Sequence, residues 1–383
     1  MKYVVCVPDG CADEPVESLG GATPLEYARL PVLASLAARG TVGRAQTIPD
    51  GLPPGSDVGN MAIFGYDPTR FHTGRAPIEA AALGLDLTGR IAYRCNLVTV
   101  GADGTMVDFA GGHPDSERAA KVIAALDEEL GAFSEGQVSF HPGVQYRHIM
   151  LAPPSWADAV CHPPHDLADG PALDHTGASA PLLLELQQRS RVVLKRFDLD
   201  TNQIWLWGQG PGPVMERFVD RYGVSAGLCT EVDLVRGLGV LAGLRIVEVE
   251  GANAWFDTNY EGMRDATIAG LRDGADLWIL HIEASDEAGH AGDVQEKIKA
   301  LENWDTRVLP GLIEALDEMG PWRMLLLPDH ATPLRLKTHT SDAVPYLMVD
   351  STVPGPGGSY TESAVAHCPP IPAHQLMAAL LAP

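Results

Sequence analysis

The chain has 383 residues, of which 45% are hydrophobic and 20% charged, and its formal net charge is −23. This is the composition of a globular protein with a sizeable core, and the length predicts two or three domains, or one large domain with an insertion. The acidic excess argues against nucleic acid or an anionic membrane as the partner, because either would need a basic face.

The N-terminal sequence and the cysteines indicate in which cellular compartment the protein is found. The first apolar run is about five residues long, too short for a signal peptide, and no stretch approaches the ~18 apolar residues of a membrane span. Six cysteines are scattered without a CxxC pair, which is the pattern of reduced thiols. We therefore expect a cytoplasmic protein without a membrane partner; the sequence leaves its oligomeric state open.

Short apolar runs that end in polar loops predict buried strands at 3–7, 204–207, 277–282, 324–327 and 346–349. Between them, apolar residues at helical spacing predict helices over 31–39, 213–222 and 294–319. This alternation indicates an α/β domain with a mostly parallel sheet flanked by helices. In such sheets the chemistry gathers at the carboxyl ends of the strands, and three of these strands end in Asp or Glu near His.

The middle of the chain has a different pattern. It contains strand-like runs at 94–100 and 146–152, a helical pattern over 116–130, and proline-rich stretches. We predict a smaller α+β domain inserted over 93–189, with 1–92 and 190–383 forming a discontinuous core.

Carboxylates and imidazoles recur just after the predicted strands. They are Asp9, Asp286, His290, Asp329, His330 and His339. This mixture of oxygen and nitrogen ligands suits Mn²⁺, Zn²⁺ or Mg²⁺, and two ions would share it. A lone DxxxH is usually a solvated helix face, but the joint occurrence after successive strands favours metal binding. The spacing of Asp286 and His290 places both on one face of a helical turn.

The segment PDGLPPGSDVGNMAIFGYDP, residues 49–68, is a constrained loop followed by a helical pattern. Ser56 lies at or near the predicted N-cap. One interpretation is an ordinary cap, since serine is favoured there. The other is a nucleophile, because a helix N-terminus favours negative charge and a bound metal would help to form the alkoxide.

Together these stretches resemble the archaeal-type cofactor-independent phosphoglycerate mutases of the alkaline phosphatase superfamily. The similarity runs from Met1 to about Val349. It includes DGCADEPVESLGGATPLEYA, PPGSDVGNMAIFGYDP, TGRAPIEAAALGLDL, YRCNLVTV, WLWGQG, FDTNYEG, HIEASDEAGHAGD, PDHATP and THTSDAVP.

The resemblance implies an alkaline-phosphatase-like core with an inserted substrate-handling domain. It implies one metal ion held by Asp9, Ser56, Asp329 and His330, and a second held by Asp286, His290 and His339. Mn²⁺ is the expected ion, with Mg²⁺ or Zn²⁺ as alternatives. Ser56 would carry the phosphoryl group during the interconversion of 2-phosphoglycerate and 3-phosphoglycerate, and the inserted domain would close to exclude water.

An anionic, small phosphorylated substrate needs cationic partners in so acidic a protein. The candidate substrate-binding residues are Arg75, Arg94, Arg147, His148, His165, Asp166 and Lys297. Arginine suits carboxylate and phosphate because it donates two parallel hydrogen bonds. The competing interpretation of each of these residues is a surface ion pair.

Two departures from the family pattern keep other acceptors open. HIEASDEAGH and LPDHATP look more like a bacterial branch proposed to phosphorylate homoserine, and Ala76 stands where a glycine is common. The runner-up function is therefore phosphoryl transfer to a small hydroxy amino acid such as homoserine, and the third is a phosphomonoesterase. A catalytically idle metal-binding protein is disfavoured, since a competent residue occupies every ligand position.

Overall fold

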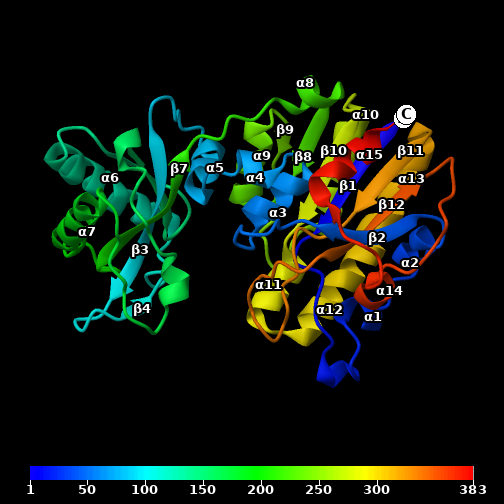
Figure 1. Cartoon of the computed structure of the whole chain (residues 1–383), viewed down its shortest axis with the longest axis horizontal. Coiled ribbons are helices and arrows are strands. Elements are labelled where there is room, and N and C mark those ends of the chain that lie inside the picture. The colour runs from blue at the N-terminus through cyan, green and yellow to red at the C-terminus, as the bar shows by residue number, and fades with distance from the viewer. Residues whose placement is uncertain (383) are drawn as a thin grey trace. The chain divides into compact units, whose positions relative to one another are not determined.

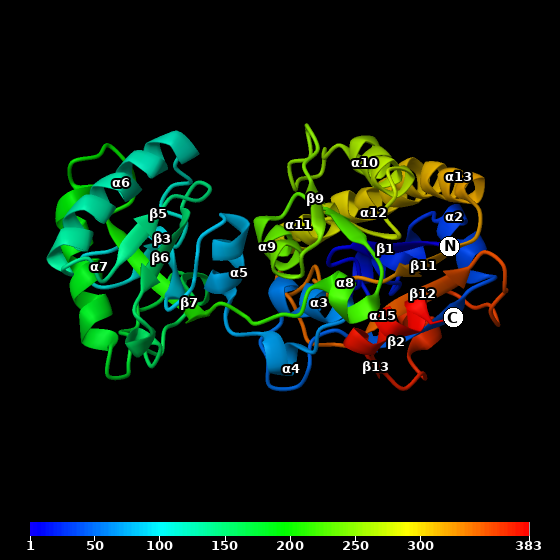
Figure 2. The same ribbon diagram turned by 90° about the horizontal axis from the view of Figure 1, so that it is seen from above.

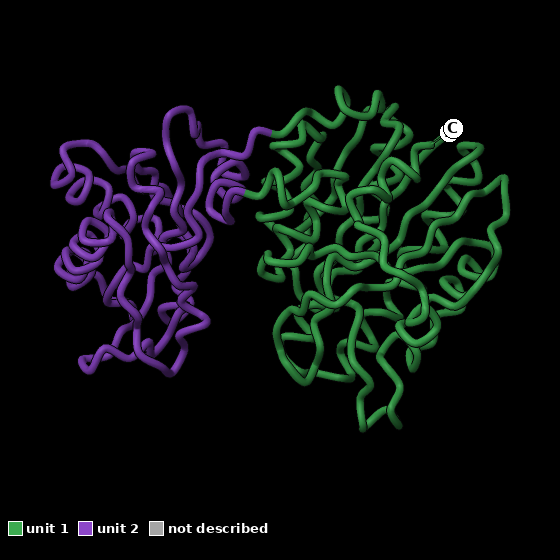
Figure 3. The backbone as a smooth tube through the Cα atoms, viewed as in Figure 1, with its two compact units in different colours: residues 1–72, 215–383 green, residues 73–214 purple. Residues whose placement is uncertain are grey.

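The computed structural model describes residues 1–382, and the chain forms two compact units. Unit 1 comprises Met1–His72 and Met215–Pro383, and unit 2 is Thr73–Val214 (Figure 3). The segment 93–189, predicted as the insertion, lies inside unit 2. Unit 2 extends beyond the expected bounds on both sides, because the helix α5 (Arg75–Ala82) and the strand β7 (Gln203–Pro211) both pack on β3 (Ile91–Val100).

Unit 1 is built on an eight-stranded sheet in the order β13-β2-β12-β11-β1-β10-β8-β9 (Figure 1). In chain order these strands are β1 (Lys2–Pro8), β2 (Thr41–Gln46), β8 (Ala226–Cys229), β9 (Arg245–Val247), β10 (Leu277–Ile282), β11 (Trp322–Leu326), β12 (Val344–Asp350) and β13 (Ile371–Pro372). The strands from β11 to β9 are parallel, and β12 runs antiparallel to both β11 and β2. The predicted α/β fold with a largely parallel sheet is confirmed.

Helices cover both faces of this sheet. They are α1 (Pro24–Tyr27), α2 (Pro31–Ala37), α3 (Ser56–Ile63), α4 (Pro68–Phe71), α8 (Phe218–Tyr222), α9 (Asp233–Leu241), α10 (Tyr260–Arg272), α11 (Ala284–Ala291), α12 (Val294–Asn303), α13 (Leu309–Met319), α14 (Glu362–Val365) and α15 (Leu376–Leu381). Helices α10, α12 and α13 lie together on one side of the sheet, and α3 and α15 lie on the other (Figure 2). Short 3₁₀ turns occupy Glu17–Leu19 and Ala373–Gln375.

The central strand β1 shows why the sheet forms. Its sequence KYVVCVP is continuously apolar after Lys2, as expected of a parallel strand covered on both faces. Val4 and Cys6 join the core cluster that includes α10 and α13, whereas Val5 and Val7 are buried on the opposite face. Because β1, β10 and β11 are parallel neighbours, the residues that follow them meet at one edge of the sheet.

Unit 2 is an antiparallel sheet with helices on its faces. Strand β3 pairs with β6 (Arg147–Ala152) on one side and β7 on the other; β5 (Ser139–His141) pairs with β6, and β4 (Met106–Asp108) with the end of β3. The helices α6 (Ser116–Phe133) and α7 (Ala180–Leu194) contribute to the core cluster on one face of β3. The helix α5 covers the other face, and 3₁₀ turns occupy Pro154–Trp156 and Pro164–Leu167.

Three predicted elements differ from the structure. The run 204–207 is a strand, but it belongs to the antiparallel sheet of unit 2 as part of β7. The helix predicted over 213–222 is limited to α8, and residues 212–217 before it have no regular secondary structure. The pattern over 294–319 is helical throughout but passes through a π-helical turn at Trp304–Val308, which places Asp305 where it accepts hydrogen bonds from the first turn of α2.

Within residues 1–382, no helix is long and apolar enough to cross a membrane. All six cysteines lie in this described part of the chain, and each is a free thiol, as the sequence predicts. A cytoplasmic location stays a prediction.

Candidate metal centre

The first group of site residues follows the two strands β1 and β11. Asp9, Asp329 and His330 are fully buried, and one potential ligand atom from each lies within 4.8 Å of the others. His330 Nε2 is 3.3 Å from Asp329 Oδ2 and 3.8 Å from Asp9 Oδ1. The parallel register of the strands thus brings together residues that are more than three hundred positions apart.

Ser56 joins this group from the start of α3. It is the first helical residue, after the N-cap Gly55, and its Oγ lies 3.2 Å from His330 Nε2. The helix approaches the Asp329 loop so closely that a Cβ on Gly59 would lie 2.2 Å from the Asp329 carbonyl oxygen. Asn60 also donates a hydrogen bond to Asp329 Oδ2 at 2.8 Å. The apolar, glycine-containing helix therefore places Ser56 at the edge of the sheet.

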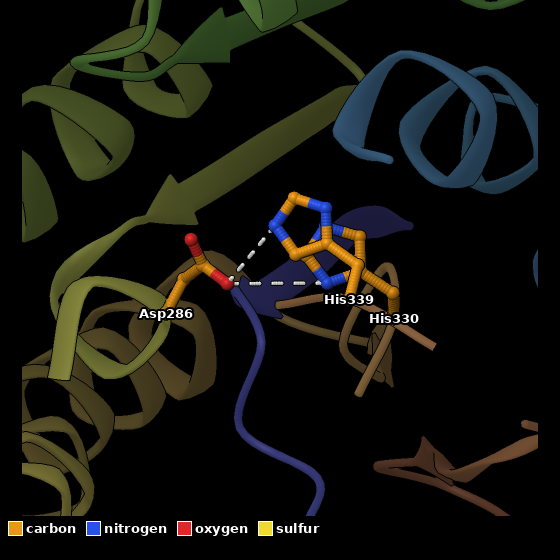
Figure 4. A group of neighbouring side chains, drawn as sticks. All are labelled: Asp286, His330 and His339. Carbon is orange, nitrogen blue, oxygen red and sulfur yellow. Dashed lines mark ion pairs between the residues drawn. The ribbon is translucent and has the colours of Figure 1, made fainter. Parts of the chain in front are cut away.

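The second group contains Asp286, His290 and His339. Asp286 and His290 lie one turn apart on α11, with His290 Nε2 3.1 Å from Asp286 Oδ2. His339, from the loop between β11 and β12, places Nε2 2.9 Å from His290 Nε2 and 3.6 Å from Asp286 Oδ1. Figure 4 shows Asp286 facing the rings of His330 and His339, which stack with centroids 3.8 Å apart. The two groups are therefore adjacent, and the structure brings together all seven residues that the sequence predicts as metal ligands.

Other residues at this centre were not predicted from the sequence. The hydroxyl of Thr332 donates a hydrogen bond to Asp286 Oδ1 and lies 3.2 Å from His330 Nδ1. The hydroxyl of Ser285 donates to the backbone carbonyl of Asp9. His281 and Glu283 lie on the far side of Asp9, at the end of β10. His281 carries a visible signal, since it is a histidine inside an otherwise apolar strand.

Burial and mutual repulsion set the charges of the carboxylates. Burial, followed by the charges of Asp329 and Glu283, raises the pKa of Asp9 well above its ordinary value. Burial also raises the pKa of Asp286, but hydrogen bonds and charges from His290 and His339 outweigh it and hold that pKa well below its ordinary value. Burial and neighbouring acids likewise raise the pKa of Glu283, so the side chains around Asp9 and Glu283 compensate their negative charge poorly.

The imidazole His330 is prepared for metal binding. Burial lowers its pKa to about 4, so the ring is neutral near pH 7. A neutral imidazole is the form that coordinates a metal. Both carboxylate oxygens of Asp9 are buried without a hydrogen-bond partner in the described structure, which is costly unless a cation is bound. The donor set of carboxylates, imidazoles and one hydroxyl fits divalent ions such as Mn²⁺ or Zn²⁺.

Several predicted substrate-binding residues cluster in unit 2. Arg94 is buried on β3, with Nε 2.9 Å from Glu79 Oε2 and its guanidinium 4.5 Å from the centre of the Trp207 ring. Arg75, the first residue of α5, lies 3.3 Å from the other oxygen of Glu79. Burial, followed by the opposing effects of Glu79 and the nearby Arg75 and Arg147, lowers the pKa of Arg94 to about 10.

The other candidates in unit 2 differ in exposure. His148 is buried, and its Nδ1 accepts a hydrogen bond from the Gly143 N–H, so its position is that of a core residue. His165 and Asp166 are exposed on a 3₁₀ turn with their side chains 3.6 Å apart, and the His165 ring lies 5.4 Å from that of Trp207. His165 therefore extends the cluster around Arg94.

Lys297 has a different environment from the one expected. It is fully buried on α12, and its ammonium donates to Asp13 Oδ2 at 2.7 Å and to the Thr332 carbonyl at 2.8 Å. Asp13 and Thr332 belong to the loops that carry Asp9 and His330. Lys297 thus links the two loops that carry Asp9 and His330. It is not exposed to a substrate, contrary to the prediction from the sequence.

The fold and this centre define a class of protein, one built to hold divalent metal ions beside a serine at a helix N-terminus. A sequence model of the 2,3-bisphosphoglycerate-independent phosphoglycerate mutases matches residues 37–199. A protein of that name from Methanothrix thermoacetophila is 46% identical over 92% of each chain. A probable one from Geobacter sulfurreducens is 42% identical over 91% of this chain and 90% of its own.

The chain belongs to the family of 2,3-bisphosphoglycerate-independent phosphoglycerate mutases. Its fold is shared with the cofactor-independent phosphoglycerate mutase of Thermoplasma acidophilum, with a TM-score of 0.65 and 22% identity over 100% of this chain and 99% of the other.

Proposed function

We propose that this protein interconverts 3-phosphoglycerate and 2-phosphoglycerate through a phosphoserine at Ser56, with two divalent ions of which Mn²⁺ is the physiological one. The observation that carries the proposal is the placement of Ser56 Oγ at the first turn of α3, 3.2 Å from His330 Nε2 and beside three buried aspartates. The names of the relatives, which cover nine-tenths of this chain, point to the same substrate.

The residues divide into two ligand sets. Asp9, Ser56, Asp329 and His330 would hold one ion, and Asp286, His290 and His339 the other. When bound, such ions lower the pKa of a coordinated hydroxyl and neutralise the oxygens of a phosphoryl group. Thr332 keeps Asp286 and His330 in position between the two sets.

The reaction is an exchange of phosphorus–oxygen bonds. Ser56 Oγ attacks the phosphorus of 3-phosphoglycerate, and the Oγ–P bond forms as the bond from phosphorus to O3 breaks. The glycerate then turns, and its O2 takes the phosphoryl group back as the Oγ–P bond breaks. One proton moves from O2 to O3 over the cycle, and neither water nor a second phosphoryl donor is consumed. The N-terminal amides of α3 favour the negative charge on Ser56 and on the phosphoserine.

Arginines of unit 2 are proposed to bind the anionic substrate. Arg75 and Arg94 approach opposite oxygens of Glu79, with Arg147 near Arg94. Guanidinium groups grip carboxylate and phosphate through parallel hydrogen bonds. His165 would add a fourth polar group beside Trp207.

Phosphorus NMR of the Mn²⁺-loaded enzyme with 3-phosphoglycerate tests this function, in the absence of nucleotide and of bisphosphoglycerate. We expect 2-phosphoglycerate to appear at its equilibrium ratio without free phosphate. Inorganic phosphate as the only product would show a phosphomonoesterase. An unchanged spectrum from metal-filled enzyme would contradict the mutase function, and homoserine with a phosphoryl donor would then be the next substrate to test.

A further inference from the structure

Asp9 faces two different groups of side chains with its two oxygens. Oδ1 is directed to the first ligand set, where it lies 3.8 Å from His330 Nε2. Oδ2 lies on the other side, 2.8 Å from His281 Nε2. His281 Nε2 is in turn 4.0 Å from Glu283 Oε2, and one ligand atom from each of Asp9, His281 and Glu283 lies within 4.8 Å of the others.

Four polar atoms of Asp9, His281 and Glu283 have no hydrogen-bond partner among the described residues. His281 Nε2, Glu283 Oε2 and both oxygens of Asp9 are buried without one in the described part of the chain. His281 is fully buried, and Glu283 is 9% exposed. His281 Nε2 and Asp9 Oδ2 are as close as hydrogen-bonded atoms, yet they do not have hydrogen-bond geometry. Two atoms that converge in this way are placed like neighbouring ligands of one octahedral ion, which lie about 3 Å apart when each is about 2.1 Å from the metal.

The other ring nitrogen of His281 is held from outside the group. Nδ1 lies 3.1 Å from the Thr230 hydroxyl, which also accepts a hydrogen bond from the Val232 N–H. A metal-binding histidine ordinarily has such a partner on its second nitrogen, because it fixes the orientation of the ring. The main chain at Glu283 is also fixed, since its backbone N–H donates to the carboxylate of Glu231.

We propose that Asp9, His281 and Glu283 form a third divalent-cation site, which shares Asp9 with the two-ion centre. Two carboxylates and one imidazole suit Mn²⁺, Mg²⁺ or Zn²⁺. The ion compensates the charge of Glu283, which is not a ligand of the two-ion centre. It also fixes Asp9 with Oδ1 toward His330. The site rests on the geometry of this group, and it does not depend on which phosphorylated substrate the enzyme uses.

The competing arrangement is a neutral Glu283 that shares a proton with Asp9 and leaves no room for an ion. The substitution Glu283→Gln separates the two. Glutamine mimics the protonated acid, so it would preserve a proton-sharing pair, whereas it weakens a cation site by removing the negative charge.

Equilibrium dialysis of the full chain against Mn²⁺, followed by metal analysis, measures the number of ions bound. We expect three per wild-type chain and two for Glu283→Gln. His281→Gln should also bind two, and Thr230→Val should bind the third ion about tenfold more weakly. The matched control is Glu318→Gln, an identical chemical change at an exposed ion pair with Arg272, which should retain three. Circular dichroism of each variant confirms that it is folded.

A second measurement locates the ion. Anomalous diffraction at the manganese edge should show a peak between Asp9, His281 and Glu283 that is missing from Glu283→Gln. A wild-type count of two, or a count that Glu283→Gln leaves unchanged, would overturn the third site. Either result would leave the mutase function untouched, since the phosphorus NMR experiment tests that function separately.

Discussion

The two units deal with buried charge in opposite ways. In unit 2 the buried Arg94 is matched within the protein, by the carboxylate of Glu79 and the ring of Trp207. In unit 1 the basic groups nearest the buried Asp9 are the imidazoles of His281 and His330, and burial lowers the pKa of both to about 4, so they are neutral near pH 7. Burial and the charges of other acids raise the pKa of Asp9. The polypeptide itself therefore neutralises the buried charge of Arg94 in unit 2. In unit 1, bound cations are needed to neutralise the buried carboxylates.

Ser56→Ala should produce the largest effect, because it removes the proposed nucleophile and leaves the rest of unit 1 in place. We expect kcat for the mutase reaction to fall by about 10⁴- to 10⁶-fold, as when other covalent nucleophiles are removed. The fold and most of the bound metal should be retained. Ser18→Ala, at an exposed position of unit 1, is the control and should keep full activity. A Ser56→Ala enzyme with near-normal turnover would show that another residue carries the phosphoryl group.

Lys297→Met should have the largest effect on the stability of unit 1. It leaves Asp13 buried without its cation, which costs about 3–5 kcal/mol. Lys299→Met, two residues along the same helix but exposed, should change the free energy of unfolding by less than about 0.5 kcal/mol. Urea unfolding measures both. If Lys297→Met were as stable as the wild type but had a raised KM, Lys297 would instead be the substrate contact that the sequence suggested.

Arg94→Ala tests the internal charge balance of unit 2. We expect a smaller loss of about 2 kcal/mol, because Arg75 still approaches Glu79 when Arg94 is gone. Hydrogen exchange should show the loss in β3 and its neighbours, while Mn²⁺ binding by unit 1 stays unchanged. Arg118→Ala, at an exposed position of α6, is the matched control. Loss of metal from Arg94→Ala would show that the two units do not balance their charges independently.

His148→Gln should have the smallest effect near neutral pH, because its contribution appears only in acid. Burial lowers the pKa of His148 to about 3, from 6.5 for an ordinary histidine. The unfolded chain therefore takes up a proton before the folded unit does. The contribution of neutral His148 to the free energy of unfolding is fully present above pH 6.5. It is lost as the pH falls toward 3, by up to about 1.4 kcal/mol per pH unit.

Glutamine at position 148 keeps an acceptor for the Gly143 N–H but does not titrate. The difference between the pH–stability curves of wild type and variant isolates His148 from other acid-sensitive groups. Parallel curves from pH 7 to 4 would show that His148 is not held neutral.

The features that depend on short segments of chain, namely the buried strands and the site residues that follow them, were predicted from the sequence. Apolar runs identified β1, β10 and β11, and since parallel strands end at one edge of a sheet, the acids and histidines that follow them could be expected to meet. Motif resemblance then assigned Ser56 and six further ligands, which the structure brings together.

What the sequence did not reveal depends on contacts between distant segments. Lys297 lies on an apolar face of its helix, and its ion-pair partner, Asp13, is 284 residues away in the sequence. His281 approaches Asp9 only through the register of β1 and β10. The run at 204–207 has the composition of a buried strand, which does not tell a parallel sheet from an antiparallel one, so the bounds of unit 2 could not be read from it.

The central claim is that unit 1 transfers a phosphoryl group through Ser56, and trapping the intermediate tests it most directly. Mn²⁺-loaded enzyme would be mixed with 3-phosphoglycerate, quenched in acid within a single turnover, digested and examined by mass spectrometry. We predict one phosphorylated peptide, carrying the group on Ser56, which is absent from Ser56→Ala. Formation of 2-phosphoglycerate with no phosphoserine, or with the group on another residue, would contradict the account.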